Sequence, residues 1–444
     1  MQDKNKLVII GDGFAAAVTA IHLLRNGIAA DSLTIIGAGP LGKGNAYGCA
    51  SPFFRLNVRE DLPIVFSEDP LHFARWAQSN TDDPDAKTSA GFFYRRAEFG
   101  RYISELITTE IGFDKIQRIQ SKVSSLNQAQ GIWKLDTADS RFIYAEKVII
   151  ATGNSPPTWP CPIQTENSEQ ASTRMIENPW TGNYLSSIST EEHIVLLGGG
   201  LTALDAIYAL AAQGHRGLIT VVGPRPLLPP SQAQWIRQKQ PNWPKNLTPA
   251  KLLRFMRQYL PPVATITTEW QNAWEELRPN LNSIWQQFTP HQRQIVFERL
   301  GWAWSLYRFR ASPQTIKAYE QLKANHQIQF VVGRAKQVEC SERGITAQLN
   351  NGHSIQAERI INCTGVGKDL FLNRLIADAI AIQDPLGTAI AVNTNLNVIK
   401  PNLQAWNNLW MLGPATMGSL GDVVAASAIS KQAEQLALDI TGAV

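Results

Sequence analysis

The chain has 444 residues, of which 44% are hydrophobic and 18% charged, and its formal net charge is +4. This composition excludes an intrinsically disordered protein, and at roughly 150 residues per domain the length predicts two or three domains. The small net charge gives no reason to expect nucleic acid or an acidic membrane as a partner. No apolar run approaches the ~20 residues of a membrane-spanning helix.

The N-terminal segment predicts a strand. Two lysines precede the apolar run Leu7–Ile10, which leads directly into Gly11. A signal peptide needs a longer apolar core and a small-residue cleavage site, so we interpret this run as the first strand of a domain.

Cysteines and histidines are scattered along the sequence. Cys49, Cys161, Cys340 and Cys363 form no Cys-x-x-Cys pair, which argues against a zinc site and a vicinal redox disulfide. Such widely separated cysteines suit a reduced, cytoplasmic setting. The seven histidines are isolated, and we expect no metal and no Ser-His-Asp arrangement.

A long internal repeat is the most informative feature. The sequence LVIIGDGFAAA begins at residue 7, and HIVLLGGGLTA begins at residue 193. Each copy combines an apolar strand, a Gly-x-Gly-x-x-Ala turn and a helical pattern. The helices are expected over residues 15–24 and 204–212, each ending at a glycine, Gly27 or Gly214.

The two copies also end alike. A second strand (33–36 and 218–222) is followed by short alternating segments, which we interpret as a small antiparallel meander, and by a closing strand that ends in Thr-Gly. The segments are 116–119, 132–135, 142–144 and closing strand 147–153 in the first copy, and 327–332, 345–349 and closing strand 359–365 in the second. Two such units predict an α/β fold with two Rossmann-like dinucleotide-binding domains.

A different region separates the halves of the second copy. It is rich in proline at first and then shows helical patterns whose starts are marked by Thr248-Pro, Thr289-Pro and Ser312-Pro. Seven of the thirteen tryptophans lie here. We interpret it as a helical insertion over the active site, with Trp270 and Trp274, one helical turn apart, in its core.

The glycine turns predict phosphate-binding sites. Such a turn has no room for a large side chain at three places: its tightest point, the ligand approach, and the contact of helix with strand. The N-terminus of the following helix then attracts phosphate. The residues at these three places are Gly11, Gly13 and Ala16 in the first copy and Gly198, Gly200 and Ala203 in the second. The alternative is that both segments are merely tight turns.

The residue after the second strand commonly holds the ribose, and here both copies depart from the pattern. An acid is expected there, but the first copy has Gly37, so Lys43 or the backbone around Gly42 and Gly44 could take over the contact. The second copy has Gly223 followed by Arg225, which could bind a 2′-phosphate and favours NADPH over NADH. Arg225 could instead be a surface residue of a loop.

Motifs over nearly the whole chain resemble the uncharacterised FAD/NAD(P)-binding proteins, distant relatives of flavin-containing and N-hydroxylating monooxygenases and of glutathione-reductase-like enzymes. The motifs are GDGFAA at 11–16, GNAYG at 44–48, LNV at 56–58, FYRRAEFGRY at 93–102, ATG at 151–153, GGLTALD at 199–205, YRFR at 307–310, DPLG at 384–387 and LGP at 412–414.

The resemblance implies FAD in the first domain and NADPH in the second. It places the FAD domain at 1–160 and 366–444, the NAD(P) domain at 161–228 and 326–365, and the insertion at 229–325. The implied cofactor-binding residues are Gly11, Gly13, Phe14, Ala16, Lys43, Asn57, Ala151, Thr152, Gly153, Gly198, Gly200, Thr202, Arg225, Gly365, Gly413, Pro414 and Gly418.

Near the C-terminus, a strand at 408–411 leads through a glycine turn into a helix expected over 419–438, whose N-terminus would face the flavin by the same resemblance. Asp422 would be an ordinary acid of its first turn. Arg95 and Arg96 would lie near the flavin or form a solvated pair that opens a helix. Tyr307, Arg308 and Arg310 would face the cleft or form a surface stripe.

These features favour an oxidoreductase in which NADPH reduces FAD, monooxygenase-like on a small organic substrate. The missing cysteine pair argues against disulfide chemistry. Two alternatives remain: a reductase of a quinone or protein acceptor, and a non-catalytic dinucleotide-binding sensor or scaffold. No catalytic residue is assigned.

Overall fold

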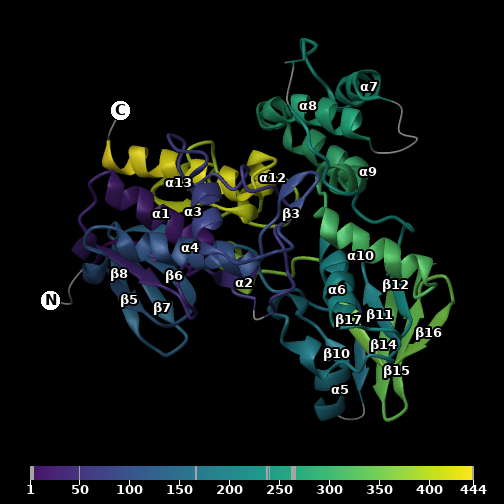
Figure 1. Cartoon of the computed structure of the whole chain (residues 1–444). Helices are drawn as coiled ribbons and strands as arrows, with labels where there is room; N and C mark the ends of the chain where they lie inside the picture. Colours follow the sequence, from purple (N-terminus) through teal and green to yellow (C-terminus); the bar gives the residue numbers. More distant parts are fainter. Residues whose placement is uncertain are drawn as a thin grey trace.

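Two sheet-containing units lie side by side, with a group of helices above the second (Figure 1). The computed structural model describes residues 5–49, 51–165, 168–236, 239, 241–261 and 267–442. Both ends of the chain lie at the outer side of the first unit. Among the described residues, no helix is both long and apolar enough to cross a membrane.

The first unit is built on a mainly parallel sheet with the strand order β18-β19-β8-β1-β2-β5, to which β7 and β6 add an antiparallel extension. Its central strands are buried, because helices cover a parallel sheet on both faces. The strands are β1 (Asn5–Ile10), β2 (Leu33–Ile36), β5 (Gln117–Ile119), β6 (Val123–Ala129), β7 (Ile132–Thr137), β8 (Phe142–Ile150), β18 (Asn397–Ile399) and β19 (Ala405–Met411).

Helices from distant parts of the chain complete this unit. The C-terminal α13 and the helix α4 both pack against α1. The helices are α1 (Phe14–Arg25), α2 (Gly44–Tyr47), α3 (His72–Asn80), α4 (Arg96–Thr109), α11 (Leu370–Ala377), α12 (Met417–Leu420) and α13 (Ala426–Thr441), with a small hairpin of β3 (Lys87–Thr88) and β4 (Gly91–Phe92).

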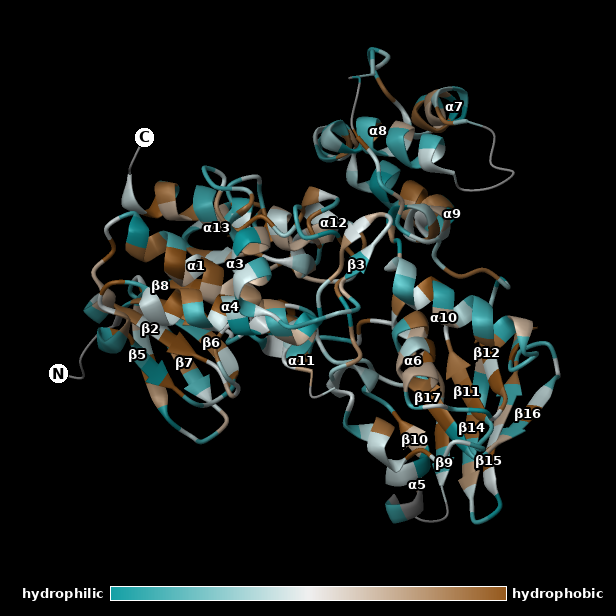
Figure 2. Cartoon of the chain, viewed as in Figure 1, coloured by the Kyte–Doolittle hydropathy of each residue, from teal (hydrophilic) through white to brown (hydrophobic). Residues whose placement is uncertain are grey.

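The second unit repeats the design with the parallel order β10-β17-β11-β12-β13 and a smaller sheet, β16-β15-β14-β9. The strands are β9 (Ile163–Thr165), β10 (Met175–Ile176), β11 (Ile194–Leu197), β12 (Ile219–Gly223), β13 (Ile328–Val332), β14 (Ala335–Ser341), β15 (Gly344–Leu349), β16 (Ser354–Ala357) and β17 (Arg359–Asn362). Its helices are α5 (Ser168–Arg174), α6 (Leu201–Ala212) and α10 (Pro313–Ala324), and α10 packs on α6. Figure 2 shows the hydrophobic strands β11 and β12 at the centre of this unit.

The upper helices are α7 (Pro249–Tyr259), α8 (Thr268–Gln287) and α9 (Pro290–Arg308). The three predicted caps are confirmed: the hydroxyls of Thr248, Thr289 and Ser312 each accept a backbone N–H at the start of α7, α9 and α10. The core position of Trp270 and Trp274 is also confirmed, since they are 1% and 3% exposed and stack on each other.

The α/β prediction with twin strand–turn–helix units is confirmed, but two of the expected meander segments are wrong. Segment 116–119 contains β5, which pairs in parallel with β2, and segment 327–332 contains β13, which pairs in parallel with β12. The meander strands β6, β14 and β16 were not predicted. Alternation indicates a half-buried strand but carries no information about its partner, so short parallel and antiparallel edge strands have the same sequence pattern.

The single helix expected over 419–438 is also wrong. The chain forms α12, breaks at Gly421 (φ 97°), and starts α13 at Ala426. Asp422 lies in the break and not in a first helical turn. An apolar helical pattern does not reveal a one-residue reversal that glycine permits.

Candidate dinucleotide-binding sites

The first glycine turn is locked against the end of β8. Gly11 has φ 132°, and its N–H donates to the carbonyl of Ile36 at 2.8 Å. A Cβ at this position would lie 2.3 Å from the carbonyl oxygen of Ala151. Only glycine fits there, as the sequence pattern predicts.

The start of α1 is free of competing groups. Gly13 is its N-cap, no side chain caps the helix, and its first turn has no acid. The hydroxyl-capped α7, α9 and α10 differ in this respect. Uncapped N–H groups with the positive end of the helix dipole suit a phosphate.

The structure brings several other candidate residues to this turn. A Cβ at Gly13 would lie 3.5 Å from the Cα of Gly44, directly after Lys43, and one at Gly413 would lie 3.7 Å from the side chain of Ala15. Thr152 and Gly153 are partly buried and follow the strand end that meets Gly11. Ala16 is fully buried in α1.

The remaining candidates of the first domain have other surroundings. Phe14 is buried against Tyr47 and Phe99, so it serves packing at the start of α1. Asn57 is partly buried, and Pro414 begins a short 3-10 turn after Gly413. At Gly418, a Cβ would meet the Asp384 carboxylate at 2.3 Å, and its carbonyl accepts the indole N–H of Trp285.

An acid from the glycine turn itself occupies the space beside Gly37. A Cβ at Gly37 would lie 2.5 Å from the Cβ of Asp12, whose carboxylate accepts the backbone N–H of Gly39 at 2.5 Å. Sequence reasoning missed Asp12, although it is the acid between the two turn glycines. Its carboxylate lies beside the strand end where the ribose-binding acid of such folds is expected.

The second turn repeats the geometry of the first. Gly198 has φ 109°, donates to the carbonyl of Val222 at 2.8 Å, and a Cβ there would lie 2.5 Å from the carbonyl oxygen of Cys363. Gly200 is the uncapped N-cap of α6, whose first turn also has no acid. Thr202 accepts a long 3.4 Å contact from Trp180, and Gly365 (φ 104°) has open space around it.

A cavity of about 230 Å³ opens at this second turn. The glycine turn and the loop after β12 form one wall, and α9 forms the other. Arg225 lies over the ring of Trp302 in α9, with its guanidinium carbon 3.9 Å from the ring centroid. The lining residues are Gly199, Gly200, Leu201, Gly223, Pro224, Arg225, Leu227, Pro229, Trp302, Ser305, Leu306 and Phe309.

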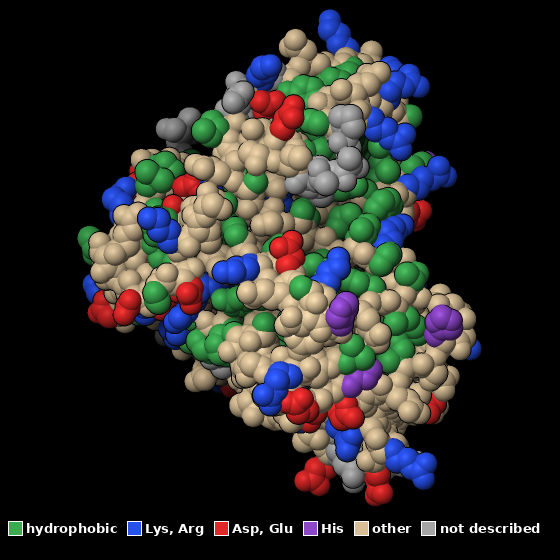
Figure 3. Space-filling view, turned by 45° about the vertical axis from the view of Figure 1, so that its right-hand side comes forward, with side chains coloured by type: hydrophobic (Ala, Val, Ile, Leu, Met, Phe, Trp, Pro, Cys, Tyr) green, Lys and Arg blue, Asp and Glu red, His purple; other side chains and the backbone are tan. Residues whose placement is uncertain are grey.

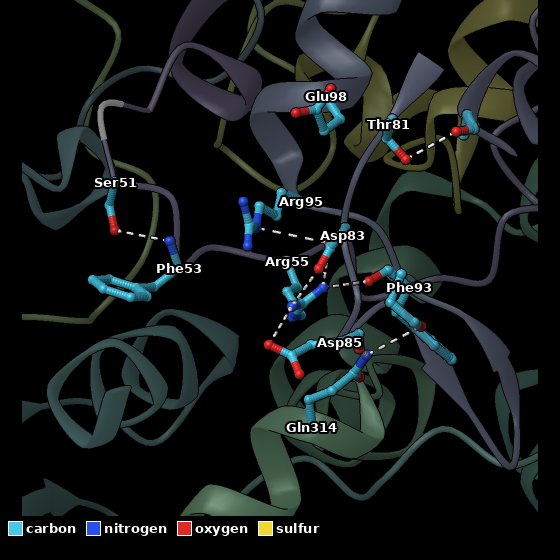
Figure 4. A network of polar contacts seen from close by, with 12 residues as sticks. Ser51, Phe53, Arg55, Thr81, Asp83, Asp85, Phe93, Arg95, Glu98 and Gln314 are labelled. Atoms are coloured by element: carbon cyan, nitrogen blue, oxygen red, sulfur yellow. Dashed lines mark hydrogen bonds and ion pairs between the residues drawn. The ribbon is translucent and has the colours of Figure 1, made fainter. Parts of the chain in front are cut away.

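A polar network joins the two units, and Figure 4 shows the part of it around Arg55, Asp83 and Arg95. Arg55, 3% exposed, donates to Asp83 at 2.8 Å and to the hydroxyl of Tyr208 in α6 at 3.2 Å. Arg96, at the start of α4, pairs with Asp205 of α6 at 2.7 Å. Burial raises the pKa of Asp205, and the Arg96 charge opposes that rise.

The alternative that Arg95 and Arg96 form a solvated pair is therefore wrong for Arg96, because Arg96 pairs with Asp205 of the other unit. Arg95 is the N-cap residue of α4 and approaches Asp83 at 3.8 Å.

A second charged cluster lies between the upper helices and the C-terminal segment. Asp422 accepts from Arg308 at 2.6 Å and from Arg278 at 3.1 Å, while Glu275 pairs with Arg310 at 2.7 Å. The surface-stripe interpretation of Arg308 and Arg310 is wrong, since both are buried. Burial pushes the pKa of Asp422 upward, but the two guanidinium groups hold it below its ordinary value.

None of the described cysteines takes part in a disulfide bond, and three of them are buried. Burial raises the pKa of Cys49, Cys161 and Cys363. A thiol with a raised pKa is a poor nucleophile at neutral pH.

Charged side chains are dispersed over the visible face of the molecule and not gathered into one continuous patch (Figure 3). This distribution accords with the small net charge.

Residues 8–155 match the model of a family described as FAD-NAD(P)-binding. A curated relative, the L-amino-acid oxidase of Bungarus fasciatus, is 27% identical over 111 residues, which is 23% of this chain and 21% of the oxidase. The match therefore spans about a fifth of that protein's length.

Solved structures resemble the whole chain. The ornithine N-hydroxylase of Kutzneria sp. 744 has a TM-score of 0.65 at 12% identity and covers 98% of both chains. The ornithine hydroxylase of Pseudomonas aeruginosa has 0.66 at 13%, and the bacillithiol disulfide reductase of Bacillus cereus has 0.57 at 14%, each covering 99% of both chains.

Residues 8–155 of the first unit thus resemble an FAD-NAD(P)-binding family, and the fold of the chain is similar to that of flavoproteins with two dinucleotide-binding domains. The predicted family resemblance is confirmed at this level. The Rossmann-type fold is confirmed with it.

Proposed function

We propose that this protein is an FAD-dependent oxidoreductase in which NADPH reduces the flavin, with monooxygenase-like action on a small organic substrate. The observation that carries this proposal is the pair of matching glycine turns, Gly11 against Ala151 and Gly198 against Cys363, each at an uncapped helix start. Bound FAD would accept a hydride from NADPH and deliver electrons to oxygen or another acceptor.

We assign the domains as the sequence predicts: FAD to residues 1–160 and 366–444, NAD(P) to 161–228 and 326–365, and the insertion to 229–325. Because α10 packs on α6 of the NAD(P) domain, we propose that the insertion ends earlier than residue 325, at about residue 311. A reducing compartment such as the cytoplasm suits cysteines that form no disulfide bond.

The residues around the first turn fit FAD. The α1 N-terminus would hold the pyrophosphate, with the backbone of Gly13 and Gly44 lining its approach. Asp12 would accept hydrogen bonds from the ribose hydroxyls, in place of the acid that Gly37 lacks. The other proposed contacts are Phe14, Ala16, Lys43, Asn57, Ala151, Thr152, Gly153, Gly413, Pro414 and Gly418.

The cavity at the second turn fits the adenosine end of NADPH. Gly198, Gly200 and Thr202 would lie beside the pyrophosphate. Arg225 would bind the 2′-phosphate, and the indole of Trp302 would offer a face to the adenine ring. Gly365 would line the path toward the nicotinamide.

A reductase that passes electrons to a quinone or protein acceptor is the second candidate. Its support is the likeness to a bacillithiol disulfide reductase and to thioredoxin reductases. Burial raises the pKa of Cys49, Cys161 and Cys363, so these thiols are poor nucleophiles. This favours an acceptor whose reduction does not pass through a cysteine of this chain. A dinucleotide-binding sensor without catalysis is the third.

One experiment separates the three. The FAD-loaded protein is mixed with NADPH without oxygen, and the flavin absorbance is followed; oxygen or an artificial acceptor dye is then added. Rapid bleaching with NADPH followed by rapid oxygen uptake supports the monooxygenase. Bleaching with slow oxygen uptake and fast dye reduction favours the reductase, and no bleaching leaves only the sensor.

A further inference from the structure

Arg310 presents one complete edge of its guanidinium group without a partner. It is 4% exposed, and its Nη1 donates to Glu275 at 2.7 Å. Its Nε and Nη2 are buried and make no hydrogen bond. A buried, charged donor without a partner has lost its hydrogen bonds to water, which costs free energy that an exposed donor does not lose. Such a group in a folded protein therefore indicates a missing ligand.

The geometry of this edge selects the occupant. Nε–H and Nη2–H of arginine point the same way in one plane, which matches the two oxygens of a carboxylate in a bidentate pair. Both free groups of Arg310 are donors only, so an acceptor-only ligand suits them.

The charge of the surrounding cluster points the same way. Arg278, Arg308 and Arg310 form ion pairs here with Asp422 and Glu275. Glu276, next to Glu275, accepts from the hydroxyl of Tyr259 of α7 instead. Among the described residues that form these ion pairs, three positive charges therefore face two negative ones, so a bound anion would improve the balance.

We propose that the free edge of Arg310 binds the carboxylate of a small organic acid between the helical insertion and the C-terminal segment. That this acid is the substrate rests on the proposed function. Asp422 connects the site with the segment before α13, whose N-terminus would face the flavin.

The test uses the FAD-loaded full chain and follows tryptophan fluorescence and the thermal unfolding midpoint. The probes are sodium acetate, sodium benzoate, the neutral benzamide and sodium phosphate. Arg310→Lys keeps the charge but loses the forked edge. Arg216→Lys is the matched control, because Arg216 lies in an exposed pair with Glu191.

Acetate or benzoate is expected to bind to the wild type and the control, and benzamide is not. Arg310→Lys should weaken carboxylate binding about 10- to 100-fold while the unfolding midpoint and FAD content stay near wild type. If Arg310→Lys fails to fold, Arg310→Met combined with Glu275→Gln replaces it, with the same expectation for binding.

Three results would overturn the proposal: no binding by either carboxylate, equal binding of benzoate and benzamide, or binding by phosphate alone. Flavin reduction by NADPH is measured in the same preparation. If NADPH reduces the flavin but no carboxylate binds, the Arg310 site is ruled out and the proposed function stands. If a carboxylate binds but NADPH does not reduce the flavin, the site stands and the proposed function is ruled out.

Discussion

A side chain on Gly11 would collide with the backbone of Ala151, because its Cβ would lie 2.3 Å from that carbonyl oxygen. The βα turn and the end of β8 are thus fitted to each other around a missing side chain. The same relationship joins Gly198 to Cys363 in the second unit, at 2.5 Å.

Gly11→Ala should therefore abolish FAD retention, lowering the flavin content of purified protein at least tenfold, because neither backbone segment can move without opening the sheet. The flavin absorbance relative to protein gives the measurement. Gly27→Ala is the control: Gly27 also has positive φ, 90°, but no atom lies within 4 Å of its added Cβ. Equal loss in both variants would show that backbone strain alone is responsible.

Arg225→Ala should reduce the preference for NADPH over NADH. The charge-assisted bond to a 2′-phosphate is worth ~1.5–3 kcal/mol, so the Kd for NADPH should rise about 10- to 100-fold, with little change for NADH. Titration with both nucleotides measures this. Arg216→Ala, at an exposed ion pair, should change neither. A parallel weakening of both nucleotides would contradict a 2′-phosphate contact.

Trp302→Ala should weaken both nucleotides, because an aromatic face does not distinguish a 2′-phosphate. The expected loss is a few-fold to about tenfold, from ~0.5–1.5 kcal/mol of ring stacking. Trp285→Ala is no control, since Trp285 bonds to Gly418; Phe297→Ala, at an exposed position of α9, is suitable. Unchanged binding in Trp302→Ala would place the adenine elsewhere.

Asp12→Asn should weaken FAD binding without abolishing it. The amide oxygen can still accept from Gly39, but the charge-assisted contact to the ribose is lost, which predicts about a tenfold higher Kd. Titration of the apoprotein with FAD measures it. Asp31→Asn is the control, because Asp31 is an exposed acid after α1. A variant that holds FAD as tightly as wild type would rule out the ribose contact.

Asp422→Asn should destabilise the fold in a pH-dependent way. Because Arg308 and Arg278 keep the pKa of Asp422 below its ordinary value, its stabilising effect is present above the unfolded pKa of ~3.9 and is lost as pH falls through the lower folded pKa.

At pH 7 the substitution leaves the buried guanidinium of Arg308 and the partly buried one of Arg278 without this partner, at a cost of ~3 kcal/mol. The urea unfolding midpoint, followed by tryptophan fluorescence, should drop clearly at pH 7, and the gap to wild type should narrow below about pH 4. Asp378→Asn, in an i,i+4 pair with an exposed arginine, should shift the midpoint little. A constant gap across pH would show that charge is not the cause.

The sequence by itself determined the two strand–turn–helix units, their glycines, and the hydroxyl caps of α7, α9 and α10. The positive φ of a turn glycine and a hydroxyl cap are local features, because they depend on residues adjacent in the chain. The segments that form β5 and β13 were predicted to belong to the antiparallel meanders, but they pair in parallel with β2 and β12. Strand pairing depends on partners far away in the sequence, which periodicity does not reveal.

Only the tertiary structure decided which side chains meet. Asp12 beside Gly37, Arg225 over Trp302, and Arg310 with its free edge all depend on segments from different elements lying together. No periodicity encodes that a charged residue is buried without a full set of partners. Burial and hydrogen-bond satisfaction are properties of the packed chain, and they carry the proposals on the nucleotide pocket and the carboxylate site.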